Sequence, residues 1–323
     1  MRTPAFALPT ELIRTELASG WGVRARSIRP FLVGFGSDHW DVLDDAGARY
    51  FVSAGVGPDP VLDSDASGLA AARALTDSGF AGALPPLRGL DGAVVRRFTT
   101  TEGDAAMLSV TEWVEPETPV TGDEVVSLLL DLHDRTDVVT GIARCDPRTA
   151  SHRVDLGRAL ADLDRPWSGP YGEQARRAGR SVRGAAIAAL DRFDRLAASL
   201  SATETVITHG EPHGGNLLRR GGVPVLIDWD TARIAPTARD LWDLTTAQQH
   251  EYEARSGRRL SREALELYRL RWDLDEIGEY LALFSESHEA TEDTEVSWEA
   301  LTESIERLVA PARCPDAEAS PVS

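Results

Sequence analysis

The sequence contains no lysine, so all 34 of its basic side chains are arginines. An arginine presents a planar fork of donors, whereas a lysine presents a compact ammonium group on a flexible stem. The two are therefore not interchangeable where a small ligand is gripped. Any site that ordinarily uses a lysine must be built differently in this chain.

Cysteine and long apolar runs are also scarce. The two cysteines, Cys145 and Cys314, form no metal-ligand spacing, and we expect both to be reduced thiols. No stretch approaches the roughly 20 apolar residues of a membrane span, and the first residues lack the apolar core of a signal peptide. We expect a cytoplasmic protein that does not engage a membrane.

Positive charge is the third deficit. The 52 acidic side chains exceed the 34 basic ones, which gives a net charge of −18. Nucleic acids and anionic membranes both require basic patches, so we exclude them as partners. The acidity is compatible with a cationic small molecule. We expect a monomer or a homodimer.

The hydrophobic pattern changes near residue 114. Before it, apolar and β-branched runs predict five strands, at residues 28–31, 39–43, 49–53, 94–98 and 106–110, and two helices, at 10–19 and 65–78. The turn Asp44-Asp45-Ala46-Gly47 joins the second and third strands as a hairpin. These elements predict an antiparallel sheet with one inserted helix.

Beyond the linker at residues 115–119 the sequence is mainly helical. Helices are predicted at residues 121–135, 151–164, 171–200, 240–255, 261–284 and 295–310, with two short apolar runs at 206–208 and 223–227. We predict an α+β fold with a nucleotide-binding lobe over residues 1–113 and a helical lobe over residues 114–323. The tail after Pro311 is expected to be disordered.

Residues 209–230 carry the groups that phosphoryl transfer requires. In His209-Gly210-Glu211-Pro212-His213-Gly214-Gly215-Asn216, the carboxylate of Glu211 and the amide of Asn216 stand five residues apart. The Asp and Asn of the kinase catalytic loop have the same offset. Asp228 follows an apolar run, as the metal-binding Asp of a kinase does. Glu211, Asn216 and Asp228 are therefore candidates for the carboxylate and the metal-binding oxygens of a phosphoryl-transfer site, and His209 could fix the loop by hydrogen bonds.

Simpler interpretations exist for each of these residues alone. A single loop carboxylate is usually just solvated, and Asp228 could be a turn former. The histidines at 209 and 213 have the spacing of a zinc pair, but Pro212 and the glycines disfavour the helix that such a pair needs. The combination is more specific than its parts.

The run from His209 to Asn216 resembles the catalytic motif of the aminoglycoside phosphotransferase family. Val225-Leu226-Ile227-Asp228-Trp229-Asp230 resembles its metal loop, and Arg239-Asp240-Leu241-Trp242-Asp243 resembles the acidic turn that follows. The resemblance implies a protein-kinase-like fold, transfer of the γ-phosphate of ATP or GTP to a hydroxyl, and Mg²⁺ at Asn216 and Asp228. Glu211 departs from the usual Asp, which lengthens the side chain by roughly 1.3 Å without changing its basicity much.

The nucleotide site is expected in the first lobe. Val33-Gly34-Phe35-Gly36-Ser37-Asp38-His39-Trp40 falls between the first two strands, where a kinase covers the phosphates. Gly34, Gly36 and Ser37 are candidate phosphate contacts, although a plain hairpin turn would look similar. The linker residues Glu112 and Val114 are expected to meet the nucleotide base.

The strand lysine that grips the α- and β-phosphates in a kinase is replaced by Ser53. Its usual glutamate partner is missing too, because Ser67 and Gly68 stand about where one is expected. Arg49, Arg96 and Arg97 are candidate replacements, and simple exposure of each is the alternative. Ser53 is kept as a cofactor-binding candidate.

The acceptor site is expected in the helical lobe. Asp230, Trp272, Asp273 and Glu276 are the candidates, because the resemblance implies acidic side chains that bind the amines of an antibiotic. The alternative for the last three is a solvated amphipathic helix.

The resemblance favours an actinomycete antibiotic phosphotransferase. A spectinomycin-like aminocyclitol or other aminoglycoside is the leading acceptor, and a nucleoside antibiotic such as capuramycin is the second. A metabolite kinase acting on choline, homoserine or a sugar, and a nucleotide-binding pseudokinase, remain alternatives.

Overall fold

The computed structural model describes residues 4–34, 36–115, 117–200 and 204–310. The predictions for the tail and for Cys314 lie outside these ranges. The chain divides into two compact units, one of Met1–Pro147 with Thr203–Ser261 and one of Arg148–Ala202 with Arg262–Ser323. The first unit therefore joins the sheet to the segment that carries the catalytic motif. The boundary at residue 113 follows the kinase lobes instead and stays a prediction.

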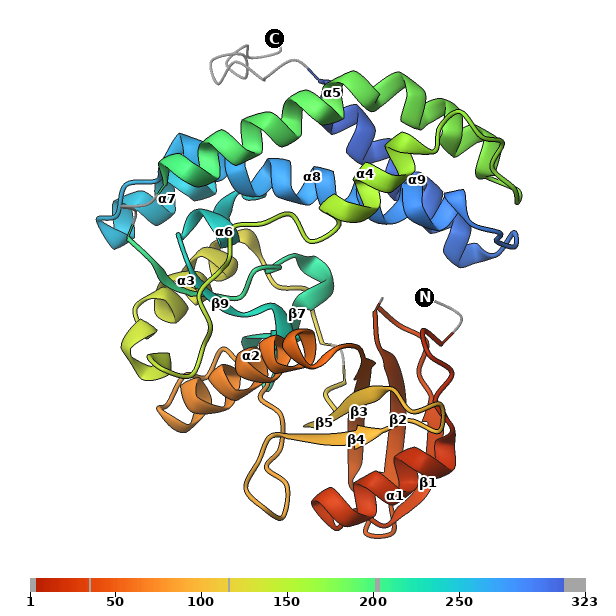
Figure 1. The fold of residues 1–323 in the computed structure, drawn as a ribbon. Coiled ribbons are helices and arrows are strands. Elements are labelled where there is room, and N and C mark those ends of the chain that lie inside the picture. Colours follow the sequence, from red (N-terminus) through yellow and green to blue (C-terminus); the bar gives the residue numbers. More distant parts are fainter. Residues whose placement is uncertain (1–3, 35, 116, 201–203, 311–323) are drawn as a thin grey trace. The chain divides into compact units, whose positions relative to one another are not determined.

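The first unit is built on a five-stranded antiparallel sheet with the order β1-β2-β3-β5-β4 (Figure 1). Its strands are β1 (Ala25–Pro30), β2 (Asp38–Asp44), β3 (Arg49–Val56), β4 (Val95–Thr99) and β5 (Ala105–Glu112). All five were predicted from the alternation of apolar and polar residues. The α+β fold class is confirmed.

The two faces of this sheet serve different purposes. Strand residues alternate between faces, and one face packs against helix α1 (Thr10–Trp21) through Ile13 and Leu17. The core on that face includes Trp40, Val52 and Leu108. The opposite face carries the intervening residues of β2 and β3, which are more polar. The predicted phosphate-binding position therefore lies on the face away from α1.

Helix α2 (Asp59–Asp77) lies on this second face, since Leu62 comes within 4.0 Å of where a Cβ on Gly55 would stand. The helix begins six residues before the predicted start at 65. Pro60 lies in its first turn, where proline is tolerated because that N–H has no helical partner. Pro60 is therefore compatible with a helix that begins at Asp59, before the predicted start.

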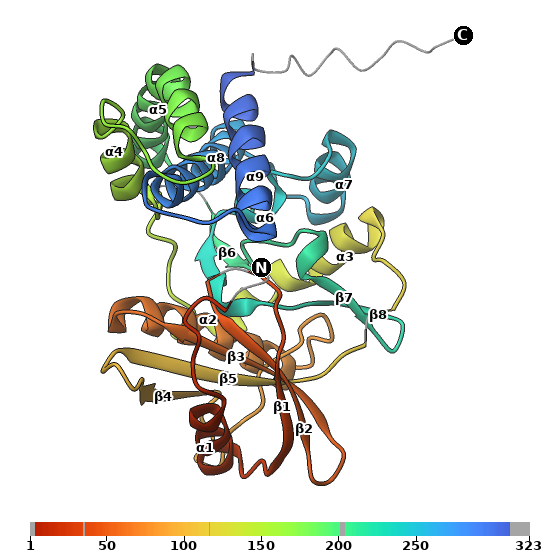
Figure 2. The same ribbon diagram turned by 90° about the vertical axis from the view of Figure 1, so that its right-hand side faces the viewer.

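The rest of the first unit consists of short elements around the catalytic motif (Figure 2). They are α3 (Gly122–His133), η1 (Thr136–Val139), β6 (Val206–Thr208), η2 (Gly214–Asn216), β7 (Leu217–Arg220), β8 (Val223–Leu226), η3 (Trp229–Thr231), β9 (Arg233–Ala235), α6 (Ala238–Leu241) and α7 (Thr246–Ser256). β6 pairs with β9, and β7 pairs with β8. The single helix predicted over 240–255 is two helices, because Thr245 and Gln248 form a capping box that begins α7.

The second unit is helical and consists of α4 (Arg153–Ala161), α5 (Gly172–Ser199), α8 (Arg262–Ser285) and α9 (Glu292–Val309). The long α8 packs against each of the other three. An aromatic group at one end holds α8 and α9 together, with Tyr171 stacked on Trp298 at 5.9 Å and Phe284 edge-on to both His288 and Trp298. Within the ranges described, no helix is long and apolar enough to cross a bilayer.

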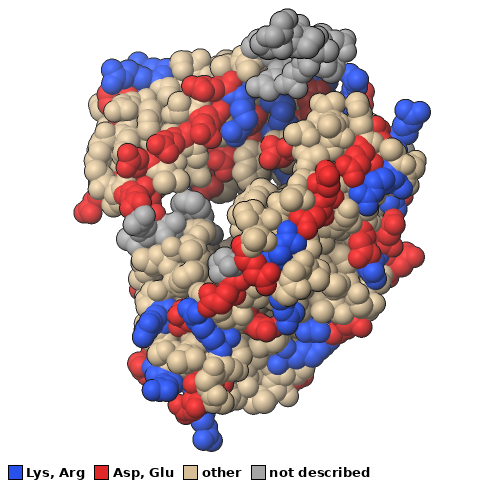
Figure 3. Space-filling view, turned by 180° about the vertical axis from the view of Figure 1, so that it is seen from behind, with Lys and Arg blue, Asp and Glu red and all other residues tan. Residues whose placement is uncertain are grey.

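Charged side chains cover much of the face drawn in Figure 3. Acidic groups extend across this face in long tracts, and basic groups lie among them. Many of the arginines form ion pairs with a neighbouring carboxylate, such as Arg153 with Asp194 at 2.6 Å and Arg192 with Glu266 at 2.8 Å. This face offers no broad basic surface of the kind that a polyanion needs.

Candidate active site

His209 fixes the start of the catalytic loop to the strand before the metal loop. Its Nε2 lies 2.7 Å from the carbonyl oxygen of Ile227, and its Nδ1 lies 3.3 Å from the backbone nitrogen of Glu211. Nε2 must therefore carry the proton, while Nδ1 accepts. Burial lowers the pKa of His209 to about 4, so the ring is neutral at pH 7. His209 is a positioning residue for the loop.

Asp240 of α6 binds the backbone of the same loop. Its two oxygens accept hydrogen bonds from the backbone N–H groups of His209 at 2.9 Å and Gly210 at 2.6 Å. His133 adds a third contact at 3.1 Å. Burial alone would raise the pKa of Asp240, but the His133 hydrogen bond and nearby positive charge hold it below its usual value. The carboxylate therefore stays ionised beneath the loop.

Arg239 explains the glycine in the motif. Its guanidinium donates to the Thr208 hydroxyl at 3.0 Å and to the Thr231 carbonyl at 2.8 Å. A Cβ on Gly210 would lie only 2.3 Å from that guanidinium, and Gly210 has a φ of +106°. Only glycine meets both conditions without strain. The Arg239-Asp240 pair thus links the catalytic loop to the metal loop.

Glu211 and Asn216 are brought together by a side-chain bond across the loop. The amide nitrogen of Asn216 donates to the backbone carbonyl of Glu211 at 3.1 Å. Nδ1 of His213 accepts a hydrogen bond from the backbone N–H of Gly215 at 3.1 Å, and Nε2 of His213 lies 4.0 Å from the Glu211 carboxylate. Because the Asn216 nitrogen is committed to the loop, its oxygen is the atom suited to a metal ion.

Asp228 is placed beside Asn216 by the backbone of Ile227. The Ile227 N–H donates to the Asn216 carbonyl at 3.0 Å, while its own carbonyl accepts from His209. Asp228 itself has left-handed backbone angles, φ 65° and ψ 64°, which are uncommon for a residue with a Cβ. Such strain is retained where the surrounding structure fixes it, typically at functional sites. The turn re-aims the carboxylate at the end of β8.

Four carboxylates influence one another around this turn. The charge of Asp230, then burial, then Glu211 and Asp65 raise the pKa of Asp228. Asp228 is exposed to solvent, which weakens these charge interactions without reversing their direction. Burial, followed by the charge of Asp230, raises the pKa of Asp65 to about 7. Oδ1 of Asp230 is buried without a hydrogen-bond partner in the structure described.

This set suits a hard divalent cation. Carboxylate and amide oxygens are the ligands that Mg²⁺ prefers, and it commonly takes only one or two protein carboxylates together with phosphate oxygens. A cation would also relieve the repulsion that raises the pKa values of Asp228 and Asp65. Among the residues described, no group of three His, Cys, Asp or Glu side chains is close enough to hold a metal alone. The predicted ligands Asn216 and Asp228 therefore fit a metal shared with a phosphorylated ligand.

Arg233 partly offsets this negative charge. Its guanidinium donates to the carbonyl of Asp230 at 2.7 Å and to the hydroxyl of Ser64 at 2.6 Å, and it lies 3.8 Å from the Asp65 carboxylate. The predicted substrate-binding residue Asp230 is thus partly buried between the metal loop and α2. Its role toward an acceptor stays a prediction.

The predicted phosphate-binding residues lie at the start of the sheet's second face. Gly34 and Gly36 have φ of +65° and +80°, and Phe35 between them lies outside the described residues. The hydroxyl of Ser37 would be 3.6 Å from a Cβ on Gly55 of β3. Ser53, also on β3, lies 2.7 Å from Nδ1 of His39 across the hairpin. Gly34, Ser37 and Ser53 thus lie on the same face of the five-stranded sheet.

The linker residues show a different pattern. The carboxylate of Glu112 forms an ion pair with Arg220, and Arg49 lies 3.7 Å from the centre of the Trp113 ring. Val114 is half-buried after the end of β5. The assignment of Glu112 and Val114 to the nucleotide base stays a prediction.

The three acceptor candidates of the second unit lie on α8. Asp273 is fully buried and ion-paired with Arg269 at 3.1 Å and Arg307 at 2.8 Å. A substrate amine could reach this carboxylate only by displacing an arginine. Trp272 and Glu276 are half-buried on the same helix, and their contact with an acceptor stays a prediction.

Comparison with known proteins decides the family. The model of the phosphotransferase enzyme family (APH) matches residues 27–280, which include the glycine loop, the catalytic loop and the metal loop. The chain belongs to this family. Protein StrN from Streptomyces griseus is 31% identical over 245 residues, covering 71% of this chain and 73% of StrN. As a member of the APH family, the chain is a phosphotransferase that acts on hydroxyl groups, and the family implies a nucleotide donor with a divalent metal.

Solved structures of similar fold agree with this assignment. A spectinomycin phosphotransferase solved with ADP and spectinomycin has a TM-score of 0.69 at 15% identity, covering 93% of this chain and 94% of that one. A microcompartment-associated aminopropanol kinase has a TM-score of 0.62 at 17% identity, covering 93% and 96%. An amicoumacin kinase has a TM-score of 0.59 at 14% identity, covering 92% of both chains. At these identities the likeness concerns the fold.

Two residues of this site were not assigned from the sequence. Asp65 stands two residues before Ser67, and its carboxylate lies 3.8 Å from Arg233 and close enough to Asp230 to feel its charge. No local spacing in the sequence indicates this proximity. His39 was not assigned although the hairpin turn gives its register. Counting back from Asp44–Gly47 pairs His39 with Ser53, so the signal was present.

Proposed function

We propose that this APH-family member transfers the γ-phosphate of ATP or GTP, as a Mg²⁺ complex, to a hydroxyl of an amine-bearing antibiotic and so confers resistance. The observation that carries the proposal is the convergence of Glu211, Asn216 and Asp228. The Asn216–Glu211 side-chain bond and the Ile227 peptide bring these three groups to one end of the β7–β8 hairpin. Phosphoryl transfer needs this combination of a carboxylate and metal-binding oxygens.

Each residue has a defined task in this mechanism. Glu211 accepts a hydrogen bond from the acceptor hydroxyl, orients it and takes its proton as the new bond forms. Asn216 and Asp228 would hold the Mg²⁺, which neutralises the charge of the transferring phosphate. His209, neutral and bonded at both nitrogens, fixes the distance between these groups. The extra methylene of Glu211 extends its reach toward the hydroxyl by roughly 1.3 Å relative to Asp.

The similar proteins support an aminocyclitol or aminoglycoside acceptor. StrN belongs to a streptomycete, and one structure of the same fold binds spectinomycin. The net charge of −18 favours approach of a polyamine. A nucleoside antibiotic such as capuramycin is the second acceptor class. Asp230, Trp272, Asp273 and Glu276 stay candidates for acceptor contacts.

The decisive experiment is a panel of acceptors tested with ATP and with GTP in Mg²⁺ buffer. The panel should include spectinomycin, streptomycin, capuramycin, choline, homoserine and simple amino alcohols. Product formation is read as a mass gain of one phosphate together with loss of antibiotic activity. We expect phosphorylation of an amine-bearing antibiotic, and preferential phosphorylation of choline, homoserine or a sugar would replace this proposal with a metabolite kinase.

Site variants test the assignment of the residues. Glu211→Gln is expected to lower kcat by roughly 10²–10⁴-fold, because it removes the proton acceptor but keeps the shape. Asp228→Asn is expected to abolish turnover because it weakens Mg²⁺ binding. Asp191→Asn and Glu299→Gln, at exposed positions of the second unit, make the same chemical changes elsewhere and should leave kcat unchanged. Near-normal turnover of Glu211→Gln would remove the base assignment.

A further inference from the structure

The second face of the five-stranded sheet carries Ser53 where the strand lysine of a kinase was expected, and the hydroxyl of Ser53 has no charge. Three arginines of this sheet, the candidate replacements, are ion-paired elsewhere. They are Arg49 with Asp41 and Glu115, Arg96 with Glu16, and Arg97 with Asp63. Their charges are committed to protein carboxylates.

His39 is the basic side chain that stands directly opposite Ser53 on this face. The two residues are direct cross-strand partners in the β2–β3 hairpin. Nδ1 of His39 lies 2.7 Å from the Ser53 hydroxyl, and its ring stacks on Phe51 at 5.0 Å with 28° between the planes. One side of the imidazole is therefore fixed in position by β3.

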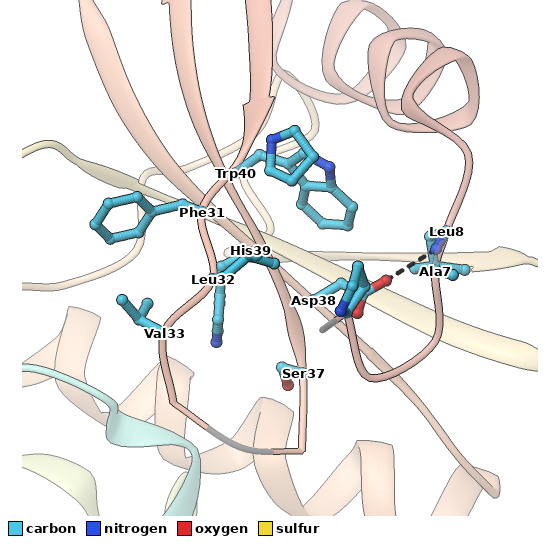
Figure 4. Close-up of a pocket in the computed structure, with 11 residues that line it drawn as sticks. Ala7, Leu8, Phe31, Leu32, Val33, Ser37, Asp38, His39 and Trp40 are labelled. Carbon is cyan, nitrogen blue, oxygen red and sulfur yellow. Dashed lines mark hydrogen bonds between the residues drawn. The ribbon is translucent and has the colours of Figure 1, made fainter. Parts of the chain in front are cut away.

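The other ring nitrogen of His39 faces the glycine loop. Nε2 would lie 3.5 Å from a Cβ on Gly34, so a backbone without a side chain passes beside it. In Figure 4 the ring extends from β2 into the space between Val33 and Ser37. A phosphate held beside Gly34 and Ser37 would lie within reach of Nε2. Ser53, His39 and the loop would then contact the same ligand.

The surroundings of His39 favour protonation of its ring only when an anion binds beside it. Burial lowers the pKa of His39 to about 4, against the opposing charge of Asp38, so the ring is neutral at pH 7. Asp38 itself accepts the backbone N–H groups of Phe6 and Leu8. The facing positions Leu32, Val33 and Gly34 of the loop, and Phe51 and Ser53 of β3, carry no ionisable side chain. A nearby phosphate would therefore dominate the electrostatics of the ring.

We propose that His39, held by Ser53, binds the nucleotide phosphates in place of the strand lysine and takes up a proton as the nucleotide binds. The inference rests on the proposed use of a nucleotide donor. The His39–Ser53 pair then replaces the fixed charge of a lysine with one that forms only in the complex. Nucleotide affinity must accordingly depend on pH. It is full below the pKa of His39 in the complex and falls as the pH rises through that value.

The test is calorimetric titration with the Mg²⁺ complex of a non-hydrolysable ATP analogue, and of the GTP analogue if ATP is not the donor. Measurement at pH 7 in buffers of different ionisation enthalpy gives the number of protons taken up. Wild type should take up between half a proton and one proton, roughly, if the complex raises the pKa of His39 to 7 or above. His39→Gln should take up none beyond the ligand's own and bind about tenfold more weakly at pH 6.5, with the gap closing toward pH 9.

Two further variants complete the test. His250→Gln, at an exposed position of α7, should match wild type in affinity and proton uptake. His39→Gln combined with Ser53→Lys should regain affinity and show no pH dependence up to pH 9, because lysine keeps its charge there. This rescue also shows that the variant chain is folded.

The outcomes separate this inference from the function on which it rests. Tight nucleotide binding and turnover without proton uptake, or unchanged binding by His39→Gln, would overturn the role of His39 and leave the kinase intact. Failure of wild type to bind any nucleotide would overturn both.

Discussion

Gly68 of α2 lies directly against the carbonyl oxygen of Trp229 in the metal loop. A Cβ built on Gly68 would stand 2.2 Å from that oxygen and 2.8 Å from the carbonyl oxygen of Asp230. Both contacts are backbone atoms, which cannot swing away as a side chain can. Gly68, one of the two positions where a kinase-type glutamate was expected, thus serves as a close packing contact between the helix and the metal loop.

Gly68→Ala should therefore both destabilise the protein and impair the reaction. We expect a loss of about 1–3 kcal/mol, because the methyl group forces α2 and η3 apart. Turnover should fall with it, since Asp228 immediately precedes the displaced segment. Thermal unfolding and kcat measure the two effects.

The control is Gly184→Ala in α5, where a Cβ meets nothing within 4 Å. Alanine is the better helix former, so this change should stabilise the protein by roughly 0.5–1 kcal/mol and leave kcat alone. A Gly68→Ala protein as stable and active as wild type would show that the contact yields easily.

The ionised carboxylate of Asp228 should lower the free energy of unfolding, and a bound divalent cation should remove this effect. Its pKa in the folded protein lies above the unfolded value, so its contribution to stability is present below pH 3.8 and is lost as the pH rises through the folded pKa. Near pH 8 without metal, Asp228→Asn should raise the free energy of unfolding by at most roughly 1–2 kcal/mol, because solvent screens the exposed carboxylate. Mg²⁺ added together with a non-hydrolysable nucleotide should raise the Tm of wild type more at pH 8 than at pH 6.

The same variant separates stability from function. Asp228→Asn should be more stable than wild type without metal, respond little to Mg²⁺ and be inactive. Asp191→Asn should follow wild type throughout. If Mg²⁺ alone leaves wild type unchanged but acts once nucleotide is present, the metal enters only as the nucleotide complex. If the metal-free Asp228→Asn protein were less stable than wild type, repulsion between Asp228 and the neighbouring carboxylates would not be destabilising the fold.

The sequence predicted the parts of this site that depend on local spacing. The catalytic loop, the five strands and the hairpin follow from glycines, alternation and a turn within a few residues of each other. Contacts between distant segments did not follow from it. Asp273 was a candidate for binding an acceptor amine, with a solvated helix as the alternative, yet Arg307, 34 positions later, neutralises it inside the helical unit. The role of Asp65 likewise depends on Asp230, and that proximity is created only when α2 packs on the metal loop.

Asp240 should be needed for both stability and turnover. Its two oxygens accept the N–H groups of His209 and Gly210, and an asparagine would present an N–H₂ group to one of them. We expect Asp240→Asn to lose about 2–4 kcal/mol, because a buried donor is left facing another donor. The value of kcat should fall at least tenfold as the catalytic loop shifts. Denaturant unfolding and steady-state kinetics test this, and retention of both properties would show that the loop is held by other contacts.

Acid should destabilise the protein through His209 before most carboxylates titrate. The ring is neutral in the folded protein with a pKa of about 4, whereas an unfolded chain has the ordinary value of 6.5. The unfolded state therefore binds the proton more readily, so the contribution to stability is fully present above pH 6.5 and is lost as the pH falls toward 4. The loss between pH 7 and pH 4 should approach roughly 3 kcal/mol. His209→Gln can still donate to the Ile227 carbonyl and accept from the Glu211 N–H, but it does not titrate. Its free energy of unfolding, measured by denaturant at each pH, should fall less steeply than that of wild type over this range. His250→Gln should keep the wild-type slope, and equal slopes for all three proteins would mean that folding does not shift the pKa of His209.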